Sequence, residues 1–291
     1  MATQNHILIF GLGYVGTALA MRLAEQGWKI TGTTRNPGAH KMFGTDGWTL
    51  LPFDSTGPIT DLDTHLHSCT AILSTIAPQD KQDPVLRYHT NLLQNFAGWS
   101  GYISATSVYA DEIDDWVDED TPPAPATERG RIRVSTEADW QGCTGAEILR
   151  VAGIYGPGRS AFTALRAGTA RIIDKSDHLF NRIHLQDITG IIMAAMAQPS
   201  ARRILNLTDN MPAKQGDVVR YAASLLGVAP PPTIPYEEAE LTPMARSFYK
   251  SRRKLRSVRV QSQLGYRLTY PNYKLGLEAT LKADMAAEDK A

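Results

Sequence analysis

Short apolar runs alternate with longer segments of helical spacing along most of the chain. The runs are typical of buried strands and lie at 6–10, 28–34, 48–53, 70–76, 101–107, 146–151 and 204–208. Residues 14–26 show the helical pattern with a wide apolar face, and Gly27 follows as a left-handed cap. Strands that alternate with helices predict an α/β fold with a Rossmann-like, doubly wound parallel sheet.

Three stretches interrupt this pattern. Residues 111–129 are rich in acids, prolines and alanines, and they predict a long surface loop. Gly156-Pro157-Gly158 breaks the chain after the sixth run, and four prolines within 229–235 predict a linker. Residues 284–291 are expected to fray as a chain end.

Composition narrows the classes of function. Of the 291 residues, 43% are hydrophobic and 21% charged, and the formal net charge is zero. This balance excludes a bulk electrostatic attraction to nucleic acid or to an anionic membrane. The two cysteines, Cys69 and Cys143, are too few for a disulfide framework and fit a reducing compartment. Since we find neither a membrane-spanning apolar run nor a signal peptide, we expect a cytoplasmic protein.

A glycine-rich segment, GLGYVG at 11–16, stands between the first predicted strand and the first predicted helix. Gly11, Gly13 and Gly16 satisfy G-x-G-x-x-G: a tight turn, close approach of a pyrophosphate, and close packing of helix on strand. The phosphates of a dinucleotide would lie on N–H groups at the positive helix end, which includes Tyr14 and Val15. The alternative is a plain tight turn.

The end of the second strand bears on which dinucleotide is bound. An NAD site places an acid there for the ribose 2′-OH, but this chain has Thr34 and Arg35. A guanidinium can bind a 2′-phosphate with two hydrogen bonds, so we predict NADP(H) in preference to NAD(H). An ordinary solvated arginine is the alternative. Asp54, after the third strand, would lie near the adenine or begin a turn.

Several further motifs occur in a fixed order. They are GTTR at 32–35, Ile76-Ala77-Pro78, YISATSVY at 102–109, LRVAGIYGPGR at 149–159 and NRIHLQD at 181–187. With the glycine segment, they make the chain resemble the extended short-chain dehydrogenase/reductase superfamily, also called the NAD-dependent epimerase/dehydratase family, over about residues 5 to 283. The resemblance places Ala77 beside the cofactor. It also implies that the pocket lies at the carboxyl ends of the strands.

The resemblance implies two domains with different binding roles along the chain. Residues 1–155 would form the dinucleotide-binding domain, and 184–210 would return to it. A smaller C-terminal substrate lobe would comprise 156–183 and 211–283, with 284–291 as a flexible tail. Members of the family act on nucleotide sugars or related carbonyl compounds, and many are homodimers. The implied partners are therefore a small-molecule substrate and a second copy of the chain.

The family's chemistry needs a general acid/base tyrosine, a lysine four residues later and an orienting Ser or Thr on the fifth strand. Aligned on Val108-Tyr109, the hydroxyl position falls on Ala105, between Ser104 and Thr106. Counting back from Glu137 places Arg129 at the tyrosine position and Arg133 at the lysine position. All three catalytic positions are thus predicted to be substituted.

Arginine stays protonated and is a poor proton shuttle, although it is a good anion clamp. Arg129, Arg131 or Arg133 would hold a phosphate or carboxylate, or would form a solvated helix start.

The candidates for contact with a substrate are Ser104, Thr106, Tyr109, Tyr155 and Arg159. For both tyrosines, a place in the core or pocket wall is favoured over catalysis. His184 and Asp187 are predicted to be structural. His65 and His67 do not have metal-site geometry, and we predict no metal.

The segment 250–259 has six basic residues in ten and would face an anionic substrate group or solvent. Two classes of function follow. The first is an NADP(H)-dependent epimerase, dehydratase or reductase with a rearranged proton donor. The second is a non-catalytic dinucleotide-binding sensor or interaction protein on the same fold.

Overall fold

The computed structural model describes residues 4–38, 48–111, 115–175, 178–249 and 252–289. The chain divides into two compact units. The first comprises Met1–Val108, Thr127–Arg150 and Thr189–Leu205, and the second comprises Tyr109–Ala126, Val151–Ile188 and Asn206–Ala291.

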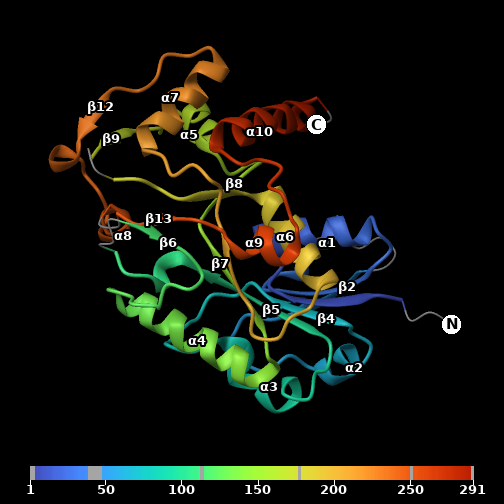
Figure 1. The fold of residues 1–291 in the computed structure, drawn as a ribbon. Coiled ribbons are helices and arrows are strands. Elements are labelled where there is room, and N and C mark those ends of the chain that lie inside the picture. Colours follow the sequence, from blue (N-terminus) through green and yellow to red (C-terminus); the bar gives the residue numbers. More distant parts are fainter. Residues whose placement is uncertain (1–3, 39–47, 112–114, 176–177, 250–251, 290–291) are drawn as a thin grey trace. The chain divides into compact units, whose positions relative to one another are not determined.

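The first unit is built on a seven-stranded sheet (Figure 1). In chain order its strands are β1 (His6–Phe10), β2 (Lys29–Thr34), β3 (Trp48–Pro52), β4 (Ala71–Ser74), β5 (Trp99–Ala105), β7 (Glu147–Val151) and β11 (Ile204–Leu207). Their spatial order is β11-β7-β5-β4-β1-β2-β3, and β1 pairs in parallel with both β2 and β4. The winding direction therefore reverses at β1, which confirms the predicted doubly wound fold. Ligands of such sheets bind at this reversal.

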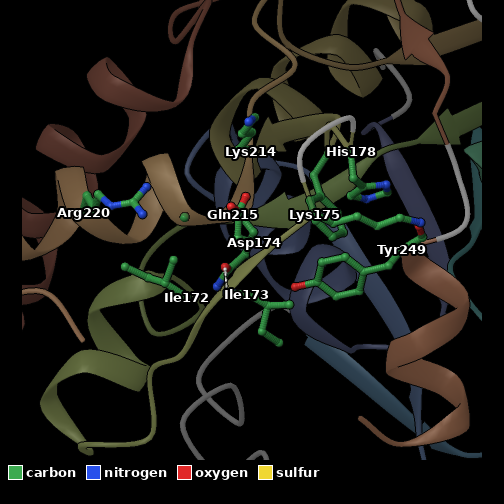
Figure 2. Close-up of a pocket in the computed structure, with 11 residues that line it drawn as sticks. Ile172, Ile173, Asp174, Lys175, His178, Lys214, Gln215, Arg220 and Tyr249 are labelled. Carbon is green, nitrogen blue, oxygen red and sulfur yellow. Dashed lines mark hydrogen bonds between the residues drawn. The ribbon is translucent and has the colours of Figure 1, made fainter. Parts of the chain in front are cut away.

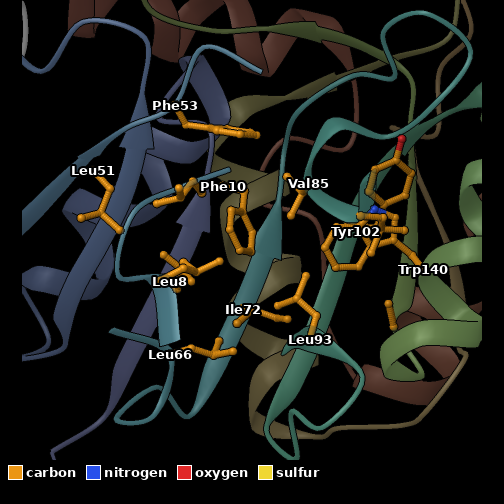
Figure 3. Packing of buried hydrophobic residues seen from close by; sticks show 14 of the residues in the cluster. Leu8, Phe10, Leu51, Phe53, Leu66, Ile72, Val85, Leu93, Tyr102 and Trp140 are labelled. Carbon is orange, nitrogen blue, oxygen red and sulfur yellow. The ribbon is translucent and has the colours of Figure 1, made fainter. Parts of the chain in front are cut away.

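Alternation along β1 divides its buried side chains between the two faces of the sheet. Leu8 and Phe10 lie in the cluster drawn in Figure 3, with Leu66, Val85 and Trp140 from the covering helices. The helices of this unit are α1 (Tyr14–Ala24), α2 (Leu62–Leu66), α3 (Pro84–Leu93) and α4 (Glu128–Thr144); α6 (Leu185–Ala197) continues into it. A short 3-10 helix, η2 (Thr106–Val108), follows β5. Both faces of the sheet are thus packed, as a parallel sheet requires.

The second unit contains short parallel strand pairs and helices. The pairs are β8 (Gly153–Tyr155) with β10 (Arg182–His184), β9 (Ile172–Asp174) with β12 (Thr233–Pro235), and β6 (Trp116–Val117) with β13 (Lys254–Leu255). The helices are α5 (Ala161–Arg166), α7 (Gln215–Leu226), η3 (Tyr236–Glu238), α8 (Pro243–Phe248), α9 (Arg259–Leu264) and α10 (Tyr273–Glu288). Phe162 and Leu277 are buried at the centre of an apolar cluster here.

Two expectations from composition differ from this structure. The proline-rich stretch expected as a linker ends in β12, because its last three residues pair with β9. Asp284, expected to begin a frayed tail, lies in α10, and its carboxylate accepts the Gly158 N–H at 3.1 Å and faces Arg166 at 3.4 Å. These long-range partners hold α10 beside α5 and the turn at Gly158.

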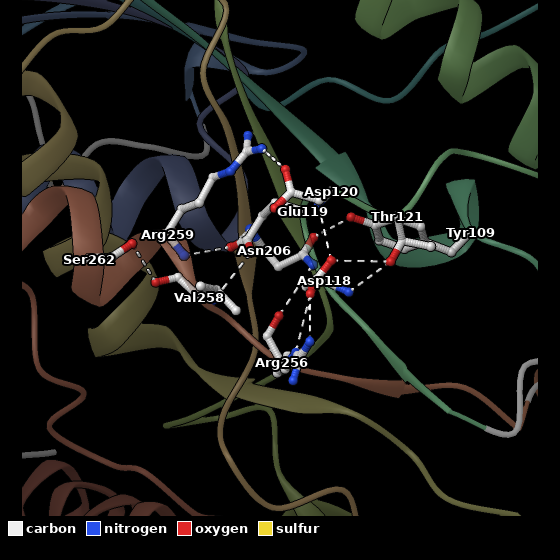
Figure 4. Close-up of polar contacts among 10 residues, drawn as sticks. All are labelled: Tyr109, Asp118, Glu119, Asp120, Thr121, Asn206, Arg256, Val258, Arg259 and Ser262. Carbon is white, nitrogen blue, oxygen red and sulfur yellow. Dashed lines mark hydrogen bonds and ion pairs between the residues drawn. The ribbon is translucent and has the colours of Figure 1, made fainter.

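The acidic segment expected as a surface loop contains a buried anchor, Glu119, whose exposed fraction is 5% (Figure 4). Its carboxylate accepts the backbone N–H groups of Asn206, Val258 and Arg259 at 3.0–3.2 Å. The carboxylate thereby fixes the start of α9 against the end of β11, since charged acceptors bind backbone N–H groups strongly.

The basic segment that follows pairs with acids of the same unit. Arg256 bonds Asp118 at 2.8 Å, and Arg259 bonds Asp120 (Figure 4). Arg253 bonds Asp111 at 2.7 Å, whereas Lys250 lies outside the described residues. The Arg256 guanidinium lowers the pKa of Asp118. These three arginines therefore pair with an acidic segment of the same unit, while Arg252 and Arg256 remain exposed to solvent, as one of the two alternatives predicts. Within the described ranges, no helix has both the length and the apolar character needed to cross a membrane.

Candidate functional site

The glycine segment forms the turn from β1 into α1, and two of its glycines are required by geometry. Gly11 has φ +94°, a conformation that favours glycine. A Cβ on Gly16 would lie 2.2 Å from the Gly11 carbonyl oxygen and 3.2 Å from Ile9. A Cβ on Gly13 would meet nothing within 4 Å. The space beside Gly13 is therefore open, whereas Gly11 and Gly16 are needed for the turn itself.

Two threonines hold this turn from both sides. The Gly11 N–H donates to the Thr33 hydroxyl at 2.8 Å, and the Thr75 hydroxyl donates to the Gly11 carbonyl at 2.7 Å. Thr33 is on β2 and Thr75 follows β4, so both sides of β1 contribute a hydrogen bond to the backbone of the same residue, Gly11. Sequence reasoning missed these residues. Their signal was a threonine at the carboxyl end of each neighbouring strand.

The amino terminus of α1 has the features of an anion site. Gly13 is its N-cap residue, and no side chain caps the helix. Helix N-termini carry unsatisfied N–H groups and a partial positive charge. Val15 is buried in the first turn, whereas Tyr14 is half-buried. The turn can thus present backbone donors to a phosphate group over the open side of Gly13.

The part of the predicted dinucleotide site that would bind the adenosine ribose lies at the carboxyl ends of β2 and β3. Arg35 is exposed directly after β2, and the Thr34 hydroxyl accepts the Asn36 N–H at 3.3 Å. Asp54 is exposed, and its carboxylate accepts the N–H and the hydroxyl of Thr56. These bonds lower the pKa of Asp54 and form the turn proposed as the alternative to an adenine contact. Ala77 is exposed after β4.

The position expected to carry the orienting hydroxyl is occupied by Ala105, the last residue of β5. The neighbouring Ser104 is buried, and its hydroxyl donates to Glu137 at 2.5 Å. Arg150 donates to both oxygens of the same carboxylate: Nη2 to Oε2 at 2.7 Å and Nε to Oε1 at 3.1 Å. Thr106 is half-buried in η2. The Ser104 hydroxyl is thus committed to a buried ion pair.

Arg133 and Arg129 occupy very different surroundings on α4. Arg133 is 8% exposed, and its guanidinium donates to the Tyr102 hydroxyl at 3.0 Å and to the Ile103 carbonyl at 3.2 Å. Arg129 is exposed in the first turn of the helix. The Arg133 guanidinium is therefore buried between α4 and β5, whereas Arg129 is accessible to solvent.

The packing behind β5 contains a second buried acid, Asp83. One oxygen accepts the N–H groups of Val85 and Leu86 at the start of α3, and the other accepts the Trp140 indole N–H at 3.1 Å. Burial raises the pKa of Asp83, and it also raises the pKa of the Tyr102 hydroxyl. A tyrosine that is harder to ionise is a poor general base, and the Tyr102 hydroxyl accepts a hydrogen bond from Arg133.

The tyrosines expected near a substrate are both buried in the second unit. The Tyr109 hydroxyl donates to Asn206 at 2.8 Å, which makes it part of the core. Tyr155 packs its ring edge-on against His184 at 5.2 Å, while Arg159 is exposed. Asp187 accepts the Tyr266 hydroxyl and two backbone N–H groups. Its contacts, like those of buried His184, are those of structural residues.

A small polar pocket in the second unit is shown in Figure 2. Lys175, Lys214 and Arg220 line it together with Asp174, His178 and Tyr249. Lys175 donates to the Tyr249 carbonyl, and Arg220 bonds Asp217 and Thr233. Within the described chain, Lys214 has no acidic partner. The pocket holds about 20 Å³, room for about one water molecule, and its lining is predominantly positive.

Asp209 is fully buried after β11, and burial raises the pKa of its carboxyl from 3.8 to about 7. One oxygen accepts the Met211 N–H at 3.0 Å; the other has no partner in the part of the chain that is described. Because the native pKa lies above the unfolded value, the folded state binds more protons between these values. Its free energy of unfolding therefore falls as the pH rises from about 4 to about 7.

We expect Asp209→Asn to remove this dependence. The stability of the variant relative to the wild type should increase by about 2 kcal/mol or more between about pH 4 and 7, and should level off above, since one pKa unit is about 1.4 kcal/mol. Urea unfolding at several pH values measures this difference. The exposed Asp217→Asn is the control, and a flat difference for Asp209→Asn would contradict the prediction.

No protein-family model matches the chain. Protein YeeZ of Escherichia coli (strain K12) is 32% identical over 249 residues, which cover 78% of this chain and 86% of YeeZ. A solved structure of a conserved, functionally unknown protein from Silicibacter pomeroyi DSS is 40% identical with a TM-score of 0.89, and the match covers 96% of this chain and 99% of that one.

Two further solved structures carry assignments. The first is a protein from Methylobacillus flagellatus described as an NAD-dependent epimerase/dehydratase. It is 28% identical with a TM-score of 0.73, and the match covers 97% of this chain and 99% of that one. UDP-glucuronic acid 4-epimerase from Bacillus cereus, in complex with NAD, shares the fold at 17% identity and a TM-score of 0.75, covering 97% and 99%. The chain therefore belongs to the extended short-chain dehydrogenase/reductase superfamily, the NAD-dependent epimerase/dehydratase family, and within it to the family of protein YeeZ. This confirms the resemblance found in the motifs.

Proposed function

We propose that the protein binds NADP(H) and acts on a nucleotide-sugar-like or other carbonyl substrate with an active site that lacks the Tyr-x-x-x-Lys pair. The observation that carries the proposal is the glycine turn. Thr33 and Thr75 hold Gly11 from both neighbouring strands, and the turn leads into a helix without a side-chain cap. A pyrophosphate supplies the acceptors that such a helix end lacks.

The preference for NADP(H) rests on the end of β2. Arg35 is exposed there, and no acid stands at the position that binds a ribose 2′-OH in NAD sites. The nearest carboxylate along the next strand, Asp54, already accepts two bonds from Thr56. A 2′-phosphate would find a guanidinium there, whereas a 2′-OH would find no carboxylate acceptor.

An anionic substrate is supported by the cations of the chain. Arg129 is exposed on α4, and the resemblance assigns it to the position of the family's tyrosine. Lys214, in the second unit, has no acidic partner within the described residues. The structural neighbour named for UDP-glucuronic acid takes a substrate with phosphate and carboxylate groups. Such groups bind well to arginine and lysine.

A second candidate function is dinucleotide binding without turnover. The observation that favours it is Arg133, whose guanidinium bonds Tyr102 and Ile103 within the packing behind β5. An arginine in that setting cannot exchange a proton near neutral pH. Ala105 adds no hydroxyl. A sensor or interaction protein would need only the binding half of the site.

We expect NADPH to bind more tightly than NADH, and Arg35→Ala to remove most of that difference, about tenfold or more in affinity, because a charged bidentate contact is lost. Isothermal titration calorimetry on cofactor-free protein measures both affinities. Arg87→Ala, which removes another exposed arginine of the same unit, is the control. Tighter binding of NADH, or equal effects of the two variants, would overturn the assignment to NADP(H).

Turnover separates the two candidate functions. Protein loaded with stoichiometric NADPH is mixed with keto sugars, and protein loaded with NADP+ is mixed with UDP-glucuronic acid. The absorbance of the reduced nicotinamide and the sugar isomers are followed in both. Oxidation of the cofactor or isomerisation of a sugar supports the enzyme. Tight dinucleotide binding with neither reaction across such a panel supports the non-catalytic protein.

A further inference from the structure

A pocket of about 270 Å³ lies within the second unit, apart from the pocket of Figure 2, with which it shares no lining residue. Residues of β8, β10, α5, α7 and α10 surround it. Its wall contains two arginines, Arg159 and Arg182, and two tyrosines, Tyr155 and Tyr273, beside apolar side chains. Such a mixture of a few polar groups with an apolar wall is typical of small-molecule sites.

Arg182 is the unusual member of this wall. Its Nη1 donates to the carbonyls of Phe180 and Ala213, at 2.8 and 3.0 Å. Burial lowers the pKa of its guanidinium. Over the described ranges, no carboxylate lies within ion-pair distance, and Nε and Nη2 have no acceptor. The side chain is half-buried, and the charge of Asp209 acts on it without forming an ion pair. The guanidinium therefore has donors left over that an anion can accept.

Tyr155 adds a buried polar group without a hydrogen-bond partner beside the same wall. The side chain is 8% exposed, and its hydroxyl has no hydrogen-bond partner in the described structure. A Cβ on Gly276 would lie 2.0 Å from this hydroxyl oxygen, so α10 passes directly beside it. A buried hydroxyl without a partner is destabilising, and such groups often mark a missing ligand or water.

Asp209, which follows β11, does not satisfy the unused donors of Arg182. The Asp209 N–H donates to the Arg182 carbonyl, yet no ion pair joins the two side chains among the described residues. The raised pKa of Asp209 leaves much of its carboxyl neutral near pH 7. Arg182 therefore keeps an incompletely balanced positive charge beside the pocket.

We propose that this pocket binds a small molecule through an oxyanion, a carboxylate or phosphate group, held by Arg182. The planar guanidinium matches either anion with two parallel hydrogen bonds. Arg159 adds positive charge at the exposed edge, and Val218 and Leu277 offer an apolar wall for a short hydrocarbon part. The site is separate from the glycine turn and does not depend on dinucleotide binding.

Calorimetric titration of the full chain, without dinucleotide, tests the site. The probes are inorganic phosphate and butyrate at constant ionic strength. We expect saturable one-to-one binding of at least one probe, and a loss of affinity of about tenfold or more in Arg182→Gln. Arg171→Gln, which changes an exposed arginine of the same unit outside the pocket, should bind as the wild type does. Arg182→Lys, which keeps the charge but not the fork, should recover only part of the affinity.

A second variant keeps the test valid if Arg182→Gln does not fold. Ala161→Phe fills the half-buried edge of the pocket and leaves both arginines in place. Loss of binding in this variant supports the site, and saturation by only phosphate or only butyrate identifies which oxyanion it takes. The proposal is overturned if neither probe saturates the wild type, or if the pocket variants bind as tightly as Arg171→Gln.

Discussion

Replacing Gly16 by alanine is expected to lower the free energy of unfolding by about 3 kcal/mol or more. The added Cβ would lie 2.2 Å from the Gly11 carbonyl oxygen, which is a backbone atom and cannot move aside alone. That carbonyl already accepts the Thr75 hydroxyl, while the Gly11 N–H donates to Thr33. The clash would therefore disturb the contacts between the turn and both strands that flank β1. Urea or thermal unfolding measures the loss.

Gly13→Ala is the matched variant, because its Cβ meets no protein atom within 4 Å and its φ is −83°. We expect its stability to lie within about 1 kcal/mol of the wild type, and its affinity for NADPH to fall by about tenfold or more, since the backbone must approach the pyrophosphate there. The pair separates folding from binding. A stable Gly16→Ala variant would contradict the packing argument, and undiminished NADPH affinity in Gly13→Ala would contradict the role of the turn.

Replacing Glu137 by glutamine is expected to cost about 3–5 kcal/mol, because it leaves the Arg150 guanidinium buried without its countercharge. The two side chains are 5% and 2% exposed, and Arg150 bonds both carboxylate oxygens. Ser104 bonds the same carboxylate, so the pair also links α4 and β7 to the end of β5. The measurement is the free energy of unfolding in urea, followed by fluorescence and circular dichroism together.

Glu128→Gln is the control for this prediction. It breaks an ion pair with Lys81 whose side chains are 62% and 74% exposed, and exposed pairs contribute about 0–1 kcal/mol. A double variant, Glu137→Gln with Arg150→Met, should be more stable than Glu137→Gln alone, because it removes the orphaned charge. If Glu137→Gln and Glu128→Gln cost the same, the buried pair does not have the stabilising role inferred here.

Features that depend on short-range sequence were predictable. The short apolar runs that alternate with segments of helical spacing predicted a doubly wound α/β fold, which the strand order confirms. Gly11 and Gly16 were identified because a turn with positive φ and a close helix contact each exclude a side chain. The ordered motifs identified the superfamily because they recur at the carboxyl ends of strands, where the chemistry of this fold is located.

Features that depend on partners distant in the sequence required the tertiary structure. Glu119 is one acid in an acid-rich segment, yet it is buried because Asn206 and Val258 bring N–H groups to it. The sequence suggests Arg133 as an anion-binding residue, yet its guanidinium is buried and donates to the Tyr102 hydroxyl on β5. In both cases the partners lie more than 30 residues away or in another element.

The chain's local pattern thus determined its sheet, its glycine turn and its superfamily, because strand alternation, turn geometry and helix packing act between near neighbours in sequence. The folded structure alone decided which charges are free. Asp118 neutralises Arg256, whereas Arg182 keeps unused donors within the described residues. Burial and long-range contacts decide between these two outcomes. Those contacts form only when the tertiary structure brings distant segments together.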